Sequence, residues 1–339
     1  MAEGEDRTLL EVRHLSVLIE TREGMIRPVS DVSFAIGRGE AVALVGESGS
    51  GKTLTGLSVL CLFPPGATVP SGEILFEGQD LLRLDAAALR MIRGQRISMI
   101  FQEPQSALNP VLTIGTQISE LFKSHTDLSD SQVRERVTER LRSAGLPDPE
   151  RVFKSYPHQL SGGMRQRVMI AMAIALNPHL VIADEPTTAL DPTIALQILA
   201  LLSSIRESRT KGLLFISHDL AHVRRVSDRV LVMYAGRIVE DTPAPRFFGN
   251  GPLHPYSRAL LSSRPSGSGG TGRETPLPAI PGQVPPLWNL PPGCAFAPRC
   301  PRADDRCRTD QPPWQSEGAS GALCFYPDLS SPGAPQHVA

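Results

Sequence analysis

The sequence lacks an apolar run long enough to cross a membrane. Its most apolar stretch, 168–183, is interrupted by Asn177, Pro178 and His179, so it falls short of the roughly 20 apolar residues that a spanning helix needs. The first ten residues, MAEGEDRTLL, are acidic and polar and contain no apolar core of a signal peptide. We therefore expect a cytosolic chain whose contact with a membrane is made through a partner.

An excess of charge is also absent. The chain has 34 Lys and Arg residues against 35 Asp and Glu residues, which gives a formal net charge of -1. Nucleic-acid-binding domains usually present a strongly basic face, so we expect no nucleic-acid partner. Cysteine is scarce, and a cytosolic location argues against disulfides. Four of the five cysteines nevertheless lie in the last fifth of the chain, and this grouping needs its own explanation.

Short apolar runs are the main positive signal for strands. Apolar and polar residues nearly alternate over 10–19 and 32–36, which predicts half-exposed antiparallel strands. The continuous apolar run 41–45 predicts a strand buried on both faces. Similar runs end at Phe101, Asp184 and Ser217, and each of these residues is followed by a polar residue. Open α/β sheets bind ligands at the carboxyl ends of their strands, so we expect a site there.

The remaining pattern divides the chain into regions. Helical periodicity dominates about 85–176, which predicts a helical insertion in an α/β core. The sequence after 251 is rich in proline and contains a Gly/Ser linker over 266–272, so it cannot be mainly helix or sheet. We expect a nucleotide-binding domain over 7–250, an irregular Pro- and Cys-rich C-terminal region over 251–329, and a disordered tail over 330–339.

Residues 46–53, GESGSGKT, match the phosphate-loop pattern G-x-x-x-x-G-K-[ST] between a buried strand and a helical run. Glycines let backbone N–H groups curl around phosphates, and the following helix N-terminus adds its dipole. We expect Lys52 to reach the β- and γ-phosphates and Thr53 to bind Mg²⁺. The alternative, a glycine-rich turn that binds nothing, fits this context less well. The predicted ATP-binding residues are Gly46, Glu47, Ser48, Gly49, Ser50, Gly51, Lys52 and Thr53.

An acidic pair supplies the second half of such a site. Asp184 closes the apolar run 180–184, where phosphate-loop nucleotidases keep the acidic residue that holds hydrated Mg²⁺. Glu185 follows directly and is placed to orient or deprotonate the attacking water. Alone, such a pair is more often a solvated loop, but together with the phosphate loop it predicts nucleotide hydrolysis.

The segment 160–167, LSGGMRQR, resembles the signature of ATP-binding cassette (ABC) proteins. A helix that begins at Ser161, Gly162 and Gly163 offers its N-terminal N–H groups to an anion. The resemblance implies that this anion is the γ-phosphate bound to a facing subunit. It therefore implies a head-to-tail dimer that encloses two ATP molecules.

Other segments match the same family residue by residue. Gln102 resembles the glutamine that contacts Mg²⁺ and couples to a membrane partner, 189–191 resembles the loop in which Asp191 communicates across the dimer, and His218 resembles the γ-phosphate sensor. We expect His158 and His222 to be structural. Where the family stacks adenine on an aromatic residue this chain has Ile19, so Ile26 or Arg27 is expected to pack on the base instead.

The resemblance narrows further at 101–110, 156–159, 233–236 and 254–256, which are similar to ATPase subunits of oligopeptide and dipeptide importers. It implies a peripheral ATPase at the cytoplasmic face of the cell membrane. The implied partners are a second, homologous ATPase, two transmembrane permease subunits and an external solute-binding protein. Some such importers carry nickel or other small solutes, and a non-transport ABC ATPase acting on nucleic acid or ribosomes is a further alternative.

Four cysteines in the C-terminal region have the spacing C-x5-C-x6-C-x16-C. A segment with little core of its own is often cross-linked by metal, but zinc sites usually contain close C-x2-C pairs. Resemblance to dipeptide-type subunits implies a 4Fe-4S cluster, with zinc or unligated or disulfide-bonded cysteines as alternatives. The four predicted ligands are Cys294, Cys300, Cys307 and Cys324. Cys61, after the phosphate loop, is expected to be an ordinary buried thiol.

Overall fold

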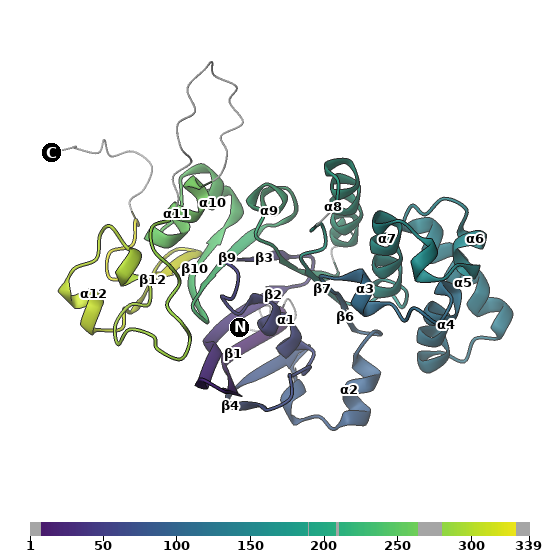
Figure 1. Cartoon of the computed structure of the whole chain (residues 1–339), viewed down its shortest axis with the longest axis horizontal. Helices are drawn as coiled ribbons and strands as arrows, with labels where there is room; N and C mark the ends of the chain where they lie inside the picture. Colours follow the sequence, from purple (N-terminus) through teal and green to yellow (C-terminus); the bar gives the residue numbers. More distant parts are fainter. Residues whose placement is uncertain (1–7, 189, 208–209, 264–279, 330–339) are drawn as a thin grey trace, which may run out of the picture.

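A computed structural model describes residues 8–188, 190–207, 210–263 and 280–329. Two β-sheets form the centre of the molecule, with a helical subdomain at one end and the C-terminal region at the other (Figure 1). The predicted linker over 266–272 and the predicted tail over 330–339 lie outside the described residues. No helix in the described ranges is both long enough and apolar enough to cross a membrane.

The smaller sheet is antiparallel and has the order β2-β1-β4-β5. Its long strands β1 and β2 form a hairpin, as the alternating sequence pattern predicts, with Val12 opposite Phe34 and Val17 opposite Val29. These side chains are buried beneath the larger sheet. The four strands are β1 (Thr8–Thr21), β2 (Gly24–Gly37), β4 (Ala67–Phe76) and β5 (Gln79–Asp80).

The larger sheet has eight strands in the order β11-β12-β10-β9-β3-β8-β7-β6. The five strands from β9 to β6 are parallel, and an antiparallel edge completes the sheet. This mixed α/β architecture confirms the predicted fold class. The strands are β3 (Ala41–Val45), β6 (Ile97–Ile100), β7 (Leu180–Asp184), β8 (Gly212–Ile216), β9 (Arg229–Tyr234), β10 (Arg237–Pro243), β11 (Trp314–Glu317) and β12 (Ser320–Leu323).

The central strand β3 packs against both layers. Ala41, Ala43 and Val45 belong to the core beneath the outer helices, whereas Val42 and Leu44 face the antiparallel sheet. This explains why the run is continuously apolar, since a strand covered on both faces has no solvent-facing positions. Helix α1 (Lys52–Val59) lies on the side of the antiparallel sheet (Figure 1). The helices on the opposite face are α8 (Pro192–Glu207), α9 (Leu220–Val226), α10 (Ala244–Gly249) and α11 (Pro255–Ser262).

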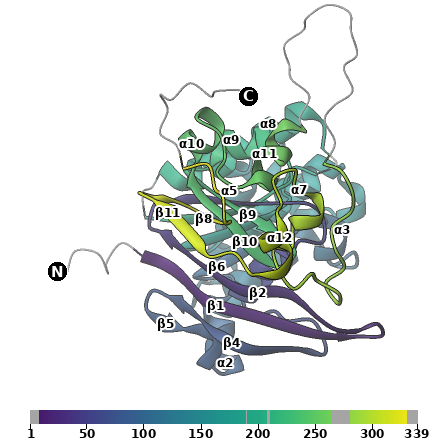
Figure 2. The same ribbon diagram turned by 90° about the vertical axis from the view of Figure 1, so that its left-hand side faces the viewer.

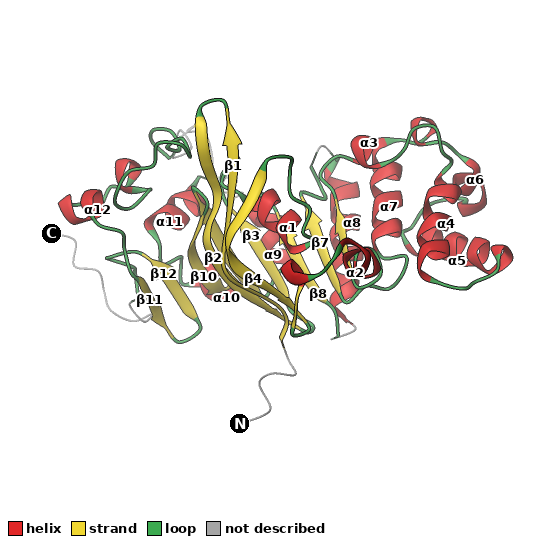
Figure 3. Cartoon of the chain, turned by 90° about the horizontal axis from the view of Figure 1, so that it is seen from below, coloured by secondary structure: helices red, strands yellow, loops and turns green. Residues whose placement is uncertain are grey.

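The helical subdomain begins later than the pattern predicts. Helix α2 (Ala86–Ile92) falls within the predicted range 85–176, but Leu89 and Ile92 pack into the core of the antiparallel sheet. The helices that cluster at one end of Figure 3 start after β6. They are α3 (Pro104–Ala107), α4 (Ile114–His125), α5 (Asp130–Ser143), α6 (Pro149–Lys154) and α7 (Gly162–Ala173), and short 3-10 turns occupy Leu81–Arg83 and Pro157–Gln159.

The C-terminal region is attached to the core through the larger sheet. It contains a 3-10 turn over Ala297–Arg299 and the short helix α12 (Asp305–Thr309), and much of the rest is irregular, as its prolines predict. The sequence did not predict the hairpin of β11 and β12. Its strand β12 pairs with β10, with Ala322 opposite Glu240, and so extends the central sheet (Figure 2).

Candidate functional site

The predicted phosphate loop connects β3 to α1 at the carboxyl end of the central strand. Its path leaves no room for side chains at two glycines. A Cβ at Gly46 would lie 2.2 Å from the Met233 carbonyl oxygen, and one at Gly51 would lie 2.1 Å from that of Pro28. Both glycines also have positive φ values, 155° and 105°, which L side chains rarely adopt. The conformation of the loop therefore requires glycine at these positions.

Lys52 is folded back into this loop. Its Nζ donates to the carbonyl oxygens of Gly46 and Glu47 at 2.9 Å each. Burial lowers the pKa of Lys52 below its usual range, and the nearby carboxylates of Glu185 and Asp184 oppose that shift. The ammonium group is thus held against two backbone carbonyls of the loop.

Asp184 ends strand β7 next to the start of α1. The Thr53 hydroxyl donates to its Oδ1 at 3.3 Å, so two of the three predicted Mg²⁺ ligands are brought together. Burial raises the pKa of Asp184 to about 6, with the Glu185 charge adding to the shift and the Thr53 hydrogen bond opposing it. A divalent cation favours the ionised carboxylate, so this buried acid suits a cation site.

Glu185 lies between the phosphate loop and His218. Its Oε1 accepts hydrogen bonds from the His218 backbone N–H at 3.0 Å and lies 2.7 Å from the His218 Nδ1, and its Oε2 accepts from the Thr188 hydroxyl at 3.0 Å. The Glu185 backbone is held in the left-handed region, at φ 48°. Glu185 is almost fully buried, whereas the His218 side chain is 65% exposed, which leaves the imidazole open to a ligand.

The signature residues lie elsewhere in the chain. Ser161 caps α7 by accepting from the Met164 N–H at 3.3 Å, and Ser161 and Gly162 are exposed. In both Figure 1 and Figure 3, α7 lies with the helical subdomain, apart from α1. Gln102 is exposed two residues after the end of β6, and Asp191 caps α8 through the Ile194 N–H. The structure therefore does not bring the signature helix to the phosphate loop of the same chain.

The expected structural histidines are engaged in local contacts. His222 Nδ1 lies 3.1 Å from the Thr187 hydroxyl, and the His158 ring stacks on Tyr156. In the adenine region, partly buried Ile19 pairs with Ile26, and Arg27 is exposed; their contact with a base stays a prediction. Ala189, in the predicted 189–191 loop, lies outside the described residues.

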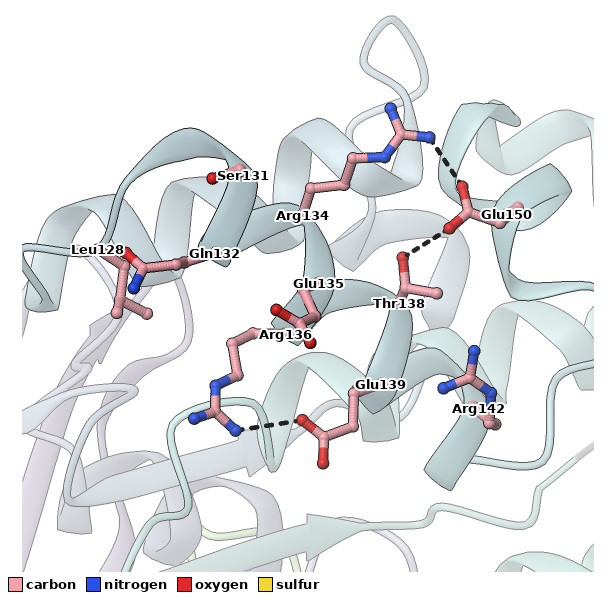
Figure 4. Close-up of a pocket in the computed structure, with 10 residues that line it drawn as sticks. All are labelled: Leu128, Ser131, Gln132, Arg134, Glu135, Arg136, Thr138, Glu139, Arg142 and Glu150. Carbon is pink, nitrogen blue, oxygen red and sulfur yellow. Dashed lines mark hydrogen bonds and ion pairs between the residues drawn. The ribbon is translucent and has the colours of Figure 1, made fainter.

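One hollow of about 800 Å³ lies apart from these residues, on the outer face of α5, and is bordered by Glu150 (Figure 4). Its charged side chains pair with one another, as in Arg134 with Glu150 and Arg136 with Glu139. This hollow is a solvated face of the helical subdomain and contains none of the predicted site residues.

Contacts from the C-terminal region to the phosphate loop were not predicted. Arg299 forms a bidentate ion pair with the Glu47 carboxylate, and the Tyr256 hydroxyl accepts a hydrogen bond from the Glu47 N–H at 2.8 Å. These partners are more than 200 positions apart in the sequence, so no local pattern connects them. The only available signal was the charged Arg299 directly after the apolar segment 295–298.

The four C-terminal cysteines line one cavity of about 20 Å³, together with Phe296 and Arg302. All four are free thiols, and burial raises their pKa values, that of Cys294 to about 11. In the described ranges, no group of three or more His, Cys, Asp or Glu side chains could hold a metal ion as they stand. The donor set fits a metal centre in kind and number, but its present geometry does not support the predicted cluster. Cys61 is partly buried, and burial raises its pKa to about 11.

Comparisons with known proteins agree with this arrangement. The family model described as ABC transporter matches residues 29–188, and the model described as oligopeptide/dipeptide transporter, C-terminal region, matches 239–307. The oligopeptide transport ATP-binding protein AppD of Bacillus subtilis is 48% identical over 306 residues, which cover 90% of this chain and 92% of AppD. The chain belongs to the ABC transporter ATP-binding proteins.

Other ABC proteins show similar agreement. The probable peptide ABC transporter ATP-binding protein y4tR of Sinorhizobium fredii is 47% identical over 90% of both chains. Among solved structures, the dimeric ATP-binding cassette MJ0796, in a post-hydrolysis state bound to ADP and Pi, matches with a TM-score of 0.63 at 30% identity. That match covers 69% of this chain and 98% of MJ0796.

Proposed function

We propose that this chain is the ATP-hydrolysing motor subunit of an ABC importer for oligopeptides or dipeptides. The single observation that carries the proposal is the joining of a phosphate loop, an acidic strand end and the Glu185–His218 pair in one site. The peptide cargo is supported by the names of the relatives, which are an oligopeptide transport protein and a probable peptide transporter component.

In the proposed reaction, residues of one chain bind and orient ATP. The loop glycines and Lys52 hold the phosphates, while Thr53, Asp184 and Gln102 hold Mg²⁺. Glu185 orients water for in-line attack on the γ-phosphate, and His218, open to solvent on its outer side, contacts that phosphate. Catalysis then rests on positioning and on neutralising developing charge.

The second half of each site comes from a facing ATPase subunit. Exposed Ser161 and Gly162 at the start of α7 are free to cover a γ-phosphate bound elsewhere, and Asp191 lies at the start of α8. We propose a head-to-tail dimer with a second, homologous ATPase. The dimeric cassette among the solved relatives is a precedent for two such chains facing each other.

The permease subunits are proposed to dock where the core meets the helical subdomain. An apolar groove of about 220 Å³ lies there beside Phe101, which directly precedes Gln102. Leu121 from α4 and Met169 and Met172 from α7 form its far wall. A helix of the permease that occupied this groove would contact both the core and the helical subdomain, and so would couple ATP binding in the dimer to transport. This assembly would sit at the cytoplasmic face of the cell membrane, supplied by an external solute-binding protein.

The C-terminal region, over 251–329, is proposed as a distinct region joined to the nucleotide-binding domain over 7–250 through the larger sheet. Cys294, Cys300, Cys307 and Cys324 are proposed to hold a 4Fe-4S cluster, with zinc as the alternative. Support comes from the convergence of the four thiols on one cavity. Such a group would cross-link a segment that has few regular elements of its own.

Transport in reconstituted vesicles tests the function. Co-expression with its proposed permease and partner ATPase subunits should yield a complex that accumulates labelled di- or oligopeptide only when ATP, Mg²⁺ and the binding protein are supplied. If the complex hydrolysed ATP in response to nickel and not to any peptide, nickel would replace peptide as the proposed cargo. A chain that instead co-purifies with nucleic acid and no membrane protein would overturn the transport function.

A further inference from the structure

The phosphate loop is held from outside by the C-terminal region. Arg299 Nη1 donates to Glu47 Oε2 at 2.7 Å, and Nη2 donates to Oε1 at 2.9 Å. The Arg299 side chain is only 4% exposed. Two parallel charge-assisted hydrogen bonds fix orientation as well as distance, so Glu47 is tied to one position.

Arg299 is itself firmly placed. Its Nε donates to the Pro281 carbonyl oxygen at 2.9 Å, and Nη1 also donates to the Tyr234 hydroxyl at 3.3 Å. Its guanidinium group lies 5.8 Å from the Tyr234 ring centre and 6.0 Å from that of Phe296. A side chain with so many fixed partners has little freedom to lose when it holds another group.

Tyr256 makes the second contact with the same loop residue. Its hydroxyl accepts from the Glu47 backbone N–H at 2.8 Å, and its ring packs on Tyr234 at 4.6 Å and on Phe296 at 5.3 Å. Burial raises the pKa of Tyr256, so the hydroxyl stays neutral. Arg299 therefore holds the side chain of Glu47 while Tyr256 holds its backbone.

Glu47 in turn sets the surroundings of Lys52. The Glu47 carbonyl oxygen accepts from Lys52 Nζ at 2.9 Å, and the Glu47 carbonyl also accepts from the Ser50 N–H at 3.2 Å. A displaced Glu47 would move the carbonyl that holds the ammonium group and change the turn that precedes Gly51. Preorganised donors lose less free energy when they bind charge than donors that must first be ordered.

We propose that Arg299 and Tyr256 are positioning residues, which act through Glu47 to hold the phosphate loop ready for nucleotide. The inference rests on the proposed function, since it takes the loop to be the ATP site. The C-terminal region then has a role in nucleotide affinity as well as in its own fold. Arg299 lies between Cys294 and Cys300 in a turn in which the Ala297 N–H donates to the Cys294 carbonyl oxygen, so the cysteine cavity adjoins this contact.

The test measures the dissociation constant of a fluorescent ATP analogue with Mg²⁺ for the full chain. Arg299→Gln should raise this constant about tenfold, because a hydrogen-bonded charge pair is lost, and Arg299→Lys should recover part of the loss. Tyr256→Phe removes one hydroxyl, keeps the packed ring, and should raise the constant about threefold. In turnover, KM should rise with little change in kcat.

A double-mutant cycle separates this role from general stability. If Arg299 acts through Glu47, the Glu47→Gln, Arg299→Gln double variant should bind no more weakly than the worse single variant. Additive losses, or wild-type affinity in both Arg299→Gln and Tyr256→Phe, would overturn the proposal. Should Arg299→Gln fail to fold, Tyr256→Phe decides alone. Lys52→Ala is the control: if the unaltered chain binds no better than this variant, the proposed function fails instead.

Discussion

Glu185 and His218 form one hydrogen-bonded unit, with Oε1 of the glutamate 2.7 Å from Nδ1 of the histidine. They come from the ends of neighbouring parallel strands, β7 and β8. The buried carboxylate also accepts a hydrogen bond from the His218 backbone N–H, so Glu185 is bound to both the backbone and the side chain of His218.

The first prediction concerns this pair. Glu185→Gln should leave ATP binding intact and lower phosphate release at least about 100-fold, because an amide cannot accept a proton from water. Binding of fluorescent ATP and release of phosphate, measured on the same preparation, check both halves. Thr188→Ala, which removes only the hydroxyl donor to Oε2, is the matched control and should lose far less. If Glu185→Gln hydrolysed ATP at the wild-type rate, Glu185 would not be the residue that orients the attacking water.

A second prediction addresses the cysteines. Protein purified without oxygen should contain iron and sulfide, or zinc, bound in proportion to the chain. Cys307→Ser should lose that metal and lower the midpoint of thermal unfolding, since the cross-link is broken. Cys61→Ser, a change at a cysteine outside the cavity, should retain the metal. Metal-free native protein whose stability Cys307→Ser leaves unchanged would argue for unligated thiols.

The third prediction follows from His254, whose imidazole is fully buried in the C-terminal region. Burial lowers its pKa from 6.5 to about 3, so below pH 6.5 the unfolded chain binds a proton that the folded chain does not. The stability that the buried, neutral His254 contributes is fully present above pH 6.5 and is lost as the pH falls toward 3. Urea unfolding at pH 7.5 and pH 5 should show this loss.

His254→Asn isolates that contribution. Asparagine can still accept the Tyr256 N–H that His254 Nδ1 accepts at 3.0 Å, but it does not titrate. The variant should be less stable at neutral pH yet show a smaller decrease between pH 7.5 and 5. Burial raises the pKa of nearby Glu240, so Glu240 makes the folded state more stable as the pH falls. This effect is present in both the native chain and His254→Asn, so it largely cancels when the two are compared. An equal decrease in both would contradict the assignment to His254.

The fourth prediction tests the apolar groove. Leu121→Glu places a charge where a permease helix is proposed to pack, so it should prevent co-purification with the permease while the chain still binds ATP. Trp288→Glu changes an exposed apolar residue, 57% accessible, outside the groove. That variant should assemble normally. If both variants assemble equally well, the permease docks elsewhere.

Sequence patterns predicted those parts of the site that are local. The phosphate loop and the acidic strand end each lie within a few consecutive residues, and apolar runs mark the strands that carry them. Helix α2 was assigned to the helical subdomain because periodicity reports which residues face a core but not which core. Leu89 and Ile92 in fact pack under the antiparallel sheet.

The contacts made by the C-terminal region could not be predicted in the same way. Strand β12 pairs with β10 across some 80 positions, and Arg299 meets Glu47 across 252. Such pairings depend on how the whole chain folds, and the short strands show no distinctive alternation among the prolines. The grouping of four cysteines in a proline-rich segment and the family resemblance predicted a shared site, but only the fold brings the four thiols to one cavity.

The most direct test of the central claim is phosphate release by the assembled complex, measured with and without Mg²⁺ for the native chain and for Lys52→Ala. The account predicts hydrolysis that requires Mg²⁺, is stimulated by the loaded binding protein, and is lost together with peptide uptake in the variant. Magnesium-independent hydrolysis, or peptide uptake that survives Lys52→Ala, would contradict it.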